Sequence, residues 1–560
     1  MYSLSQQPDG RVKSSWQVMV SLIGYIKQKI SIKYAAVGLF AGLFLMVIFT
    51  FRDYGIAWDE HLHLQYGKYL VDYYLGLLSG HPDLKATTYS NLYVYGGAYD
   101  LFTAILEKLI NHFVPIREIE FHHLINGLIG VIGILGAWAT ARLLAGYKAA
   151  FWAAIFLSII PVYYGHMFFN PKDIPFAVGY IWSLYFLFRV LKNRQKMTWI
   201  GILLLGVSIG ITSAIRVGGL ILIGYFGLGL IWNYWITRPA QSPVNFRDLL
   251  IKVLLPAVIT LIISWGVMLA FWPWSQQNPI ANPFHALFRL SEIEGPSVVL
   301  YRGIFFPTNK LPLDYIFGYF AVTLPELLIA MLLIGLVIFI QSLLRQKNIF
   351  SSPTFKFVGC ILLVLSVLIP PLIAILANTI LYDGIRHFLF VIPPLACLAG
   401  ITFETMLDRI SLRRRNLAIV IQGMVGILLI YQVSLLVSLH PYEYIYYNSL
   451  VGGTKIASQR YETDYWGTAG SEAAQWLSKY LKENHLGQDR LIKVYYCDDE
   501  SSVKYYLPKN IKITYDSNRA DYFIGGIRYF CNDEFNGEEI FSVTRMGVDL
   551  AAIKIPSQIK

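Results

Sequence analysis

Two adjacent carboxylates, Asp59 and Glu60, lie within ten residues of the end of an apolar stretch at residues 34–51. A carboxylate can deprotonate an attacking hydroxyl group, so both residues are candidates for a general base. His61 and His63 follow the pair and raise the alternative of a metal site. Side chains at positions i and i+2 diverge on a helix, which favours solvated histidines over metal ligands.

Basic side chains recur in three other short polar segments between apolar runs. Lys172 lies in "NPKDIPF", Arg216 separates two apolar runs, and Arg386 and His387 lie in "YDGIRHF". Cations can hold a phosphate or diphosphate and can stabilise the charge that develops on a leaving phosphate. Together with a carboxylate base, they suit the transfer of a group from a lipid phosphate.

Several of these residues also have a purely structural interpretation. Asp59 and Asp173 could each cap the N-terminus of the helix that follows. Asn170 could belong to a turn, and Lys172 could extend toward lipid headgroups. We keep both interpretations open and retain Asn170, Asp173 and Tyr382 as candidate supports of the site.

The elements that position these residues are predicted to lie in a membrane. The chain has 560 residues, of which 56% are hydrophobic and only 14% are charged, and its mean hydropathy is +0.51. Soluble domains carry about 25% charged residues. Apolar runs near twenty residues recur along the chain, and each is long enough to cross about 30 Å of hydrocarbon. We therefore predict a polytopic α-helical membrane protein.

Eleven membrane spans are predicted from these runs, with a retained first span, since no small-residue cleavage site follows it. The preceding segment "WQVMVSLIGYIKQKI" is expected to form a short interfacial helix. The spans lie near residues 34–51, 122–141, 149–165, 174–190, 198–215, 217–236, 253–272, 321–343, 357–377, 387–406 and 417–438.

The distribution of basic residues predicts the orientation of these spans. With a cytoplasmic amino terminus, the inside segments hold 21 Lys and Arg residues, whereas the short outside connections hold only Lys172, Arg216 and Arg386. Such asymmetry marks the cytoplasmic side. The net charge of +11 is then mainly a topology signal, and no nucleic-acid partner is needed to explain it. Arg216 and Arg386 are single arginines on the outer side, where this charge bias predicts few. Their position therefore favours a functional role.

Three segments are expected on the outer side of the membrane. Residues 52–121 form a long loop with amphipathic helices that lie on the membrane surface, and residues 273–320 an irregular covering loop. The apolar faces of the first loop are Leu62, Tyr66, Tyr69, Tyr73 and Leu77, and Phe102, Ile105, Leu106, Leu109 and Phe113. The tyrosine-rich run "YEYIYYN", at the start of the tail, is interpreted as interfacial aromatics.

The tail, residues 439–560, has the composition of a water-soluble α/β domain of roughly 100 residues. A helix is predicted in "GSEAAQWLSKYLKENH" and strands in "LIKVYYC", "IKITY" and "DYFIGG". Residues 1–33 would be a cytoplasmic segment and residues 34–438 the catalytic domain. Cys360 and Cys397 lie in spans as packing residues, whereas Cys497 and Cys531 could form a disulfide outside the cytoplasm.

The predicted topology brings the polar segments to one side of the membrane. Ionisable groups at membrane depth usually face protein or a water-filled cavity. We therefore expect a cavity at the outer membrane face, with carboxylates close to Lys172, Arg216, Arg386 and His387.

The motifs "WDE" at Trp58–Glu60, "NPKDIPF" and "RHFLFVIPP" carry a resemblance to the GT-C membrane glycosyltransferases. More narrowly, residues 30–410 resemble a bacterial member of family 39, which includes protein O-mannosyltransferases and the enzyme that adds aminoarabinose to lipid A. The tail lacks the internal sugar-binding repeats of the eukaryotic protein O-mannosyltransferases, which puts a protein acceptor in doubt.

This resemblance implies a polyprenyl-phosphate-linked sugar as donor and inversion at the anomeric carbon. Asp59 would be the base, and Glu60 would position the acceptor or share that role. Our charge argument adds Lys172, Arg216 and Arg386, with His387, as phosphate ligands.

The expected partners are the donor, membrane lipids and a lipid, glycan or protein acceptor. No cofactor is firmly implied, and a divalent cation is left open. We expect a multi-pass protein of the bacterial inner membrane, with its site facing the periplasm or cell exterior. The alternative is a transporter or flippase of lipid-linked sugars, which would carry its ionisable groups mid-span and show broken helices in paired halves.

Overall fold

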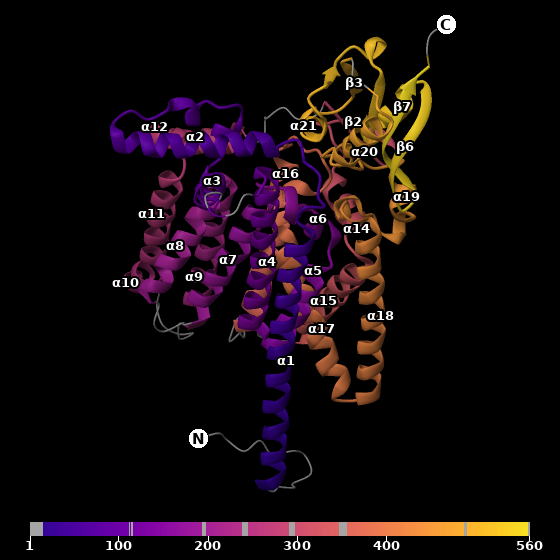
Figure 1. Ribbon diagram of the computed structural model, residues 1–560. Helices are drawn as coiled ribbons and strands as arrows, with labels where there is room; N and C mark the ends of the chain where they lie inside the picture. Colours follow the sequence, from indigo (N-terminus) through magenta and orange to yellow (C-terminus); the bar gives the residue numbers. More distant parts are fainter. Residues whose placement is uncertain are drawn as a thin grey trace.

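The computed structural model describes residues 15–110, 113, 116–192, 198–237, 245–289, 297–345, 355–486 and 490–557. A bundle of apolar helices carries a smaller α/β unit at one end (Figure 1). All eleven predicted spans overlap helices of this bundle. These helices are α1 (Ser15–Thr50), α4 (Glu118–Ala145), α5 (Tyr147–Ser158), α6 (Pro161–Phe169), α7 (Asp173–Lys192), α8 (Trp199–Ser213), α9 (Ile221–Thr237), α11 (Leu255–Ala270), α15 (Glu326–Arg345), α16 (Phe355–Leu376), α17 (Ile392–Ser411) and α18 (Arg415–Leu439).

Nine helices in the described part of the chain are long and apolar enough to cross a membrane. The pair α5 and α6 adds one more if it is counted as a single span, although it is bent by 67°. Helix α8 is apolar but has only 15 residues, fewer than the ~20 of a usual span. The prediction of a multi-span helical membrane protein is confirmed.

The predicted continuous span at residues 149–165 was wrong in one respect, because the helix breaks at Ile160. Pro161 opens α6 at its first helical position, where a residue without a backbone N–H is tolerated. After the break, Gly165 packs against the backbone of Tyr444, where a larger side chain would not fit. The bend therefore directs the last turn of α6 toward the tail.

The predicted interfacial helix before the first span was also wrong. Residues 15–50 form one continuous helix, α1, which extends beyond the other helices of the bundle (Figure 1). No proline interrupts this segment, so nothing in the backbone separates an interfacial part from a spanning part.

The first long loop folds as predicted into two amphipathic helices, α2 (Glu60–Ser79) and α3 (Ala98–Ile110), with short 3₁₀ turns η1 (Leu84–Thr87) and η2 (Leu92–Val94) between them. Helix α2 lies across one end of the bundle (Figure 1). Tyr66 and Tyr73 of its apolar face are buried, whereas Leu77, Phe102 and Leu109 are exposed. The exposed apolar side chains are available to the membrane surface, and their contact with it stays a prediction.

The second long segment is more regular than predicted. Its elements are α12 (Pro273–Gln277), α13 (Ala281–Arg289), strands β1 (Val298–Tyr301) and β2 (Ile304–Pro307), and α14 (Tyr315–Thr323). The two strands pair antiparallel through a turn at Arg302 and Gly303, both of which have positive φ values, 54° and 82°. A two-residue turn of this kind requires left-handed backbone, for which glycine is well suited.

The tail contains a five-stranded sheet with the order β4-β3-β5-β7-β6. The three predicted strands are the parallel part of this sheet, and the predicted helix is α20 (Ala469–Glu483). The antiparallel pair β6 and β7 was missed, because the edge strand β6, "GEEIFSVTR", begins with polar residues and lacks a regular alternation of apolar and polar residues. The strands are β3 (Ile492–Tyr496), β4 (Ile511–Thr514), β5 (Tyr522–Gly526), β6 (Gly537–Arg545) and β7 (Val548–Pro556).

A disulfide joins Cys497, just after β3, to Cys531, as the tail composition had suggested. Cys531 opens the short helix α22 (Cys531–Glu534), and η9 (Arg528–Phe530) directly precedes it. The disulfide therefore ties the segment after β5 to the end of the neighbouring strand β3.

The connection between α18 and α20 was misinterpreted as interfacial aromatics. Tyr442, Tyr444, Tyr446 and Tyr447 are all buried. The turn η6 (Glu443–Ile445) lies against α6, so this run is part of the protein core. The predicted domain division at residue 439 stays a prediction, but residues 441–448, directly beyond it, are buried, and η6 among them packs against α6.

We predict that the amino terminus and the connection between α17 and α18 face the cytoplasm, whereas the carboxyl terminus does not. A reporter active only in the cytoplasm should be active when fused after Arg413 and silent when fused after residue 560. The opposite pattern would invert the whole topology and place the polar site on the cytoplasmic side.

Candidate active site

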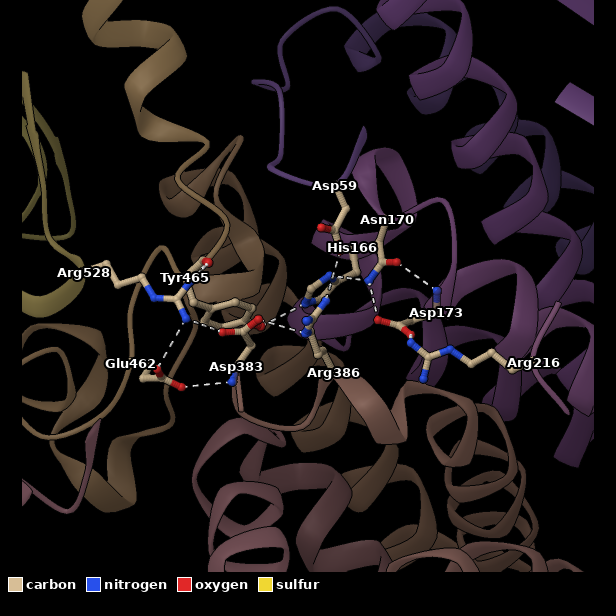
Figure 2. A network of polar contacts seen from close by, with 10 residues as sticks. All are labelled: Asp59, His166, Asn170, Asp173, Arg216, Asp383, Arg386, Glu462, Tyr465 and Arg528. Carbon is tan, nitrogen blue, oxygen red and sulfur yellow. Dashed lines mark hydrogen bonds and ion pairs between the residues drawn. The ribbon is translucent and has the colours of Figure 1, made fainter. Parts of the chain in front are cut away.

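Polar side chains from six separate segments meet where the bundle touches the tail. Figure 2 shows them as one connected network that extends from Arg528 of the tail to Arg216 in the helical bundle. Asp59 precedes α2, Asp173 opens α7, and Arg386 opens the 3₁₀ turn η5 (Arg386–Val391) ahead of α17. The predicted convergence of the polar loops is therefore present in the structure.

Asp59 occupies the N-cap position of α2 but does not act as its cap. Its side chain makes no capping hydrogen bond. The carboxylate is 38% exposed, and its Oδ2 lies 3.7 Å from a terminal nitrogen of Arg386. The structure thus favours the functional interpretation of Asp59 over the capping one, since the group is accessible and faces a cation.

Glu60 has a different environment, although it is the next residue. Its Oε2 accepts a hydrogen bond from the backbone N–H of Ala57 at 2.7 Å, and its Oε1 lies 2.8 Å from Nε2 of His123. The side chain is buried. Both oxygens have partners within the protein, so Glu60 supports the loop that carries Asp59, and its role in the reaction stays a prediction.

His61 and His63 do not come together as metal ligands. Nδ1 of His63 lies 2.8 Å from Oδ1 of Asp100 on α3, whereas His61 is exposed on another face of α2. Within the described ranges, no three His, Cys, Asp or Glu side chains are grouped so that they could hold a metal ion.

Arg386 is the central cation of the site. Its Nε lies 2.9 Å from Oδ2 of Asp383, and its guanidinium lies 4.8 Å from the ring centres of both Tyr382 and Trp466. Aromatic faces attract a guanidinium and hold its plane. Asp383 has a φ of 58°, a left-handed conformation that Asp tolerates better than most residues. This turn places the carboxylate beside Arg386.

Asn170 organises the connection between α6 and α7. Its Oδ1 accepts hydrogen bonds from the backbone N–H groups of Lys172 and Asp173, at 3.2 and 2.8 Å. Its Nδ2 donates to Oδ2 of Asp173 at 3.0 Å and contacts Nδ1 of His166 at 3.2 Å. Asp173 forms an ion pair with Arg216. The turn that was considered structural therefore also positions the charged groups.

Lys172 and Arg216 share an aromatic neighbour, Tyr95. The Lys172 ammonium lies 3.0 Å from the centre of the Tyr95 ring, and the Arg216 guanidinium lies 5.9 Å from it. Burial, together with the nearby positive charge of Arg216, lowers the pKa of Lys172 to about 7. Lys172 is therefore a cation whose charge changes near neutral pH.

His387 is near the site but is not part of its ion pairs. Its ring contacts Tyr382 edge-on, with ring centres 4.8 Å apart. Tyr382 thus lies between the His387 ring and the Arg386 guanidinium. His387 and Tyr382 therefore pack together beside Arg386. A direct contact between His387 and the phosphate stays a prediction.

Sequence reasoning missed the tail's contribution to this site. Arg528 donates to Oδ1 of Asp383 at 2.8 Å, and Oε2 of Glu462 accepts from the backbone N–H of Asp383 at 3.0 Å. Burial and the nearby Asp383 raise the pKa of Glu462 to about 8. The hydroxyl of Tyr465 lies 2.9 Å from Nε2 of His166. The aromatic and acidic run "YETDYW" was a usable signal for Glu462 and Tyr465, whereas Arg528 had none.

The arrangement can bind an anion and accept a proton. Three arginines, Arg216, Arg386 and Arg528, lie in the network with the carboxylates of Asp59, Asp173 and Asp383. Oriented guanidinium groups bind phosphate oxygens strongly. Asp59 is the most accessible of the three carboxylates.

Comparisons with known proteins concern the family and the fold of the chain. Residues 118–265 match the family model of dolichyl-phosphate-mannose-protein mannosyltransferases. The structure superimposes on the apo oligosaccharyltransferase of Archaeoglobus fulgidus with a TM-score of 0.50 at 11% identity, over 87% of this chain and 65% of that one. The chain has the GT-C fold.

Other GT-C structures are similar at a lower level. ArnT from Cupriavidus metallidurans, bound to undecaprenyl phosphate, gives a TM-score of 0.46 at 14% identity, over 94% of this chain and 98% of that one. No curated protein sequence matches the chain significantly. The family match includes Asn170, Lys172, Asp173 and Arg216 of the candidate site, but neither Asp59 nor Arg386.

We predict that the two adjacent acids differ in their contribution to stability. Glu60→Ala leaves a buried histidine and a backbone N–H without their acceptor, which should lower the free energy of unfolding by about 1–3 kcal/mol. Asp59→Ala, the matched control, removes a partly exposed group and should change it little. Thermal unfolding in detergent measures both variants, and equal melting temperatures would contradict the structural role of Glu60.

Proposed function

We propose that this chain is an inverting glycosyltransferase that moves a sugar from a polyprenyl-phosphate donor to a hydroxyl acceptor. The observation that carries the proposal is the accessible Asp59 carboxylate 3.7 Å from Arg386, in a group of cations at one end of the helical bundle. The GT-C fold and the match to a family named for a polyprenyl-phosphate sugar donor support it. The transporter alternative gains no support from either.

In the proposed reaction, Asp59 takes the proton of the acceptor hydroxyl. The acceptor oxygen forms a bond to the anomeric carbon as the bond from that carbon to the phosphate oxygen breaks. The polyprenyl phosphate leaves with the electron pair, and a single displacement inverts the configuration. Arg386 neutralises the charge on the leaving phosphate, which is the developing charge of the transition state.

Lys172 and Arg216 are proposed to bind the same phosphate from the other side of the Arg386 position. Tyr95 lies against both cations, Asn170 fixes the turn that carries Lys172, and Asp173 forms an ion pair with Arg216. The contact between Asp59 and Arg386 is loose enough for the reacting sugar to enter between them. Sugar transfer from the lipid-phosphate donor would then occur at the membrane surface.

We propose that the site faces the outside of a bacterial inner membrane. The basic residues counted on the opposite side support this orientation. The acceptor is a lipid, glycan or protein hydroxyl, and membrane lipids surround the bundle.

We predict that Asp59→Asn lowers sugar transfer by ~10²-fold or more, the usual scale for losing a general base, while donor binding is retained. Asn has the same size but cannot accept the proton at neutral pH. Purified protein with a polyprenyl-phosphate sugar allows binding and the single-turnover rate to be measured separately. Full activity of this variant would remove Asp59 as the base.

Arg386→Ala should instead weaken donor binding as well as turnover, because the phosphate loses a charge-assisted hydrogen-bond partner. The same two measurements test it. If only the turnover fell and binding stayed unchanged, Arg386 would not be a donor ligand in the ground state.

Lys172 predicts a pH dependence of phosphate binding. Because its pKa lies at about 7, its ammonium is charged below pH 7 and is neutral above it. Binding of undecaprenyl phosphate to the wild type, relative to Lys172→Met, should therefore be strongest at pH 6 and should lose its advantage by pH 8. The comparison cancels the titration of the phosphate itself. A ratio that is constant over this range would exclude Lys172 as a titrating ligand.

A further inference from the structure

We propose that the tail completes the donor site through Arg528, a positioning residue that keeps Arg386 available for phosphate, and that the Cys497–Cys531 disulfide holds Arg528 in place. The inference rests on the proposed function, since the donor phosphate is the group that Arg386 would bind. It assigns a function in the reaction to a domain that lies outside the family match.

Arg528 is more deeply buried than any other arginine of the network, with 3% of its side chain exposed. One terminal nitrogen donates to Oδ1 of Asp383 at 2.8 Å, and the other donates to the backbone carbonyl of Tyr465 at 2.6 Å. Its guanidinium lies 4.4 Å from the ring centre of Trp58, the residue before Asp59. Arg528 therefore contacts the segment that carries Arg386, through Asp383 (Figure 2), and the segment that carries Asp59, through Trp58.

Asp383 is the group through which Arg528 would act. Its two oxygens are divided between two arginines, with Oδ1 bound to Arg528 and Oδ2 to Arg386. Arginine and carboxylate readily form a bidentate pair with two parallel hydrogen bonds. Without Arg528, Asp383 could offer both oxygens to Arg386 and neutralise it. Arg528 thus holds Asp383 in a one-sided contact and keeps it off the terminal nitrogens of Arg386, one of which faces Asp59 at 3.7 Å.

The backbone that carries Arg528 needs an external support. Tyr529 and Phe530 have φ values of 56° and 57°, a left-handed conformation that large side chains adopt rarely. Cys531 follows them directly and is joined to Cys497 at the end of β3. The disulfide therefore closes the segment only three residues after Arg528, and it fixes this segment relative to the sheet.

Tyr465 provides a second connection between the tail and the helical part of the site. Its carbonyl accepts from Arg528, while its hydroxyl contacts His166 near the end of α6. From His166 the network continues through Asn170 to Asp173. Arg528 is thus held on both sides by groups that also position the proposed phosphate ligands.

The chain contains a matched control for Arg528. Arg545 also lies in the tail, donates to a carboxylate, Glu472, at 2.8 Å, and donates to the carbonyl of His440 at 2.9 Å. Its guanidinium lies 5.0 Å from the ring centre of Tyr442. The two arginines make the same kinds of contact, but within the described part of the chain the hydrogen bonds, ion pair and ring contact of Arg545 do not involve Asp383 or Arg386.

The test compares the wild type with Arg528→Gln, Arg528→Lys and Arg545→Gln, each as the full-length protein in detergent. Two probes are used, undecaprenyl phosphate and undecaprenol, which has the same chain without the phosphate. We expect Arg528→Gln to bind undecaprenyl phosphate about tenfold more weakly, in the range found for residues within one salt-bridge network. Arg528→Lys should be intermediate, and Arg545→Gln should match the wild type.

The neutral probe separates positioning from structural damage. Undecaprenol should bind Arg528→Gln as it binds the wild type, because the apolar contacts do not depend on Arg386. If both probes lose affinity together, or if Arg545→Gln loses as much as Arg528→Gln, the role is structural and the inference is overturned. Unchanged phosphate binding in Arg528→Gln also overturns it.

The disulfide is tested in a double-mutant cycle with Arg528→Gln. Replacing Cys497 and Cys531 by Ser should weaken phosphate binding in the wild type and have no further effect in Arg528→Gln, because both changes act through the same arginine. Independent, additive losses would overturn the link between disulfide and arginine. If Arg528→Gln does not fold, Arg528→Lys and the serine variant decide the question by the same two probes.

Failure of the proposed function gives a different result from failure of this inference. A wild type that binds undecaprenyl phosphate no better than undecaprenol contradicts the phosphate site itself. A wild type that prefers the phosphate, with an Arg528→Gln variant that prefers it equally, contradicts only the role of the tail.

Discussion

The Asp383 carboxylate, shared between Arg386 and Arg528, is the interaction on which the site depends. Each oxygen binds a different arginine, one from the helical part and one from the tail. A carboxylate with one partner would form a closed pair and leave no net positive charge for an anion. Two guanidinium groups on one carboxylate leave one positive charge that Asp383 does not neutralise, and Asp59 faces it only at 3.7 Å. The loops, the bent helix and the tail all act to hold this arrangement.

Burial makes such a cluster costly unless every charge has a partner. Removing ions from water costs several kcal/mol each in proteins, and only good geometry offsets this. The network meets the requirement by alternating acids and bases, from Arg216 and Asp173 in the helical bundle, past Arg386, to Asp383 and Arg528. Asp59 is the exception, because it is partly exposed and makes only a loose contact. A group held in this way can change partners when a substrate enters.

The tail is part of the site and not an appended module. Its first residues, including Tyr444 and Trp466, are buried against α6 and Arg386, and Arg528 lies deeper still. On the helical side of this contact, the break before Pro161 turns His166 toward the tail, where it meets the hydroxyl of Tyr465. The same contact surface thus joins the two parts and builds the cluster of charges. A change in the relative position of the two parts would be transmitted directly to Arg386.

Much of this protein could be predicted from local sequence patterns. Runs of apolar residues determine the spans, because a helix must be about twenty residues long to cross the hydrocarbon layer. Few other elements of proteins require apolar runs of that length. The alternation of apolar residues marked the parallel strands of the tail, and the amphipathic patterns marked α2 and α3. The acidic pair and the separate basic residues were recognised by their chemical type alone.

Only the tertiary structure decided what neighbouring residues do. Asp59 and Glu60 have almost the same chemistry and adjacent positions, yet one faces Arg386 and the other is fixed by Ala57 and His123. The partners of Arg386 come from residues far apart in the chain, and Arg528 is 142 positions away from it. Periodicity reports local backbone geometry, whereas an ion pair depends on where distant segments pack. The sequence therefore determined the membrane architecture and the candidate groups, and packing decided which of them form a site.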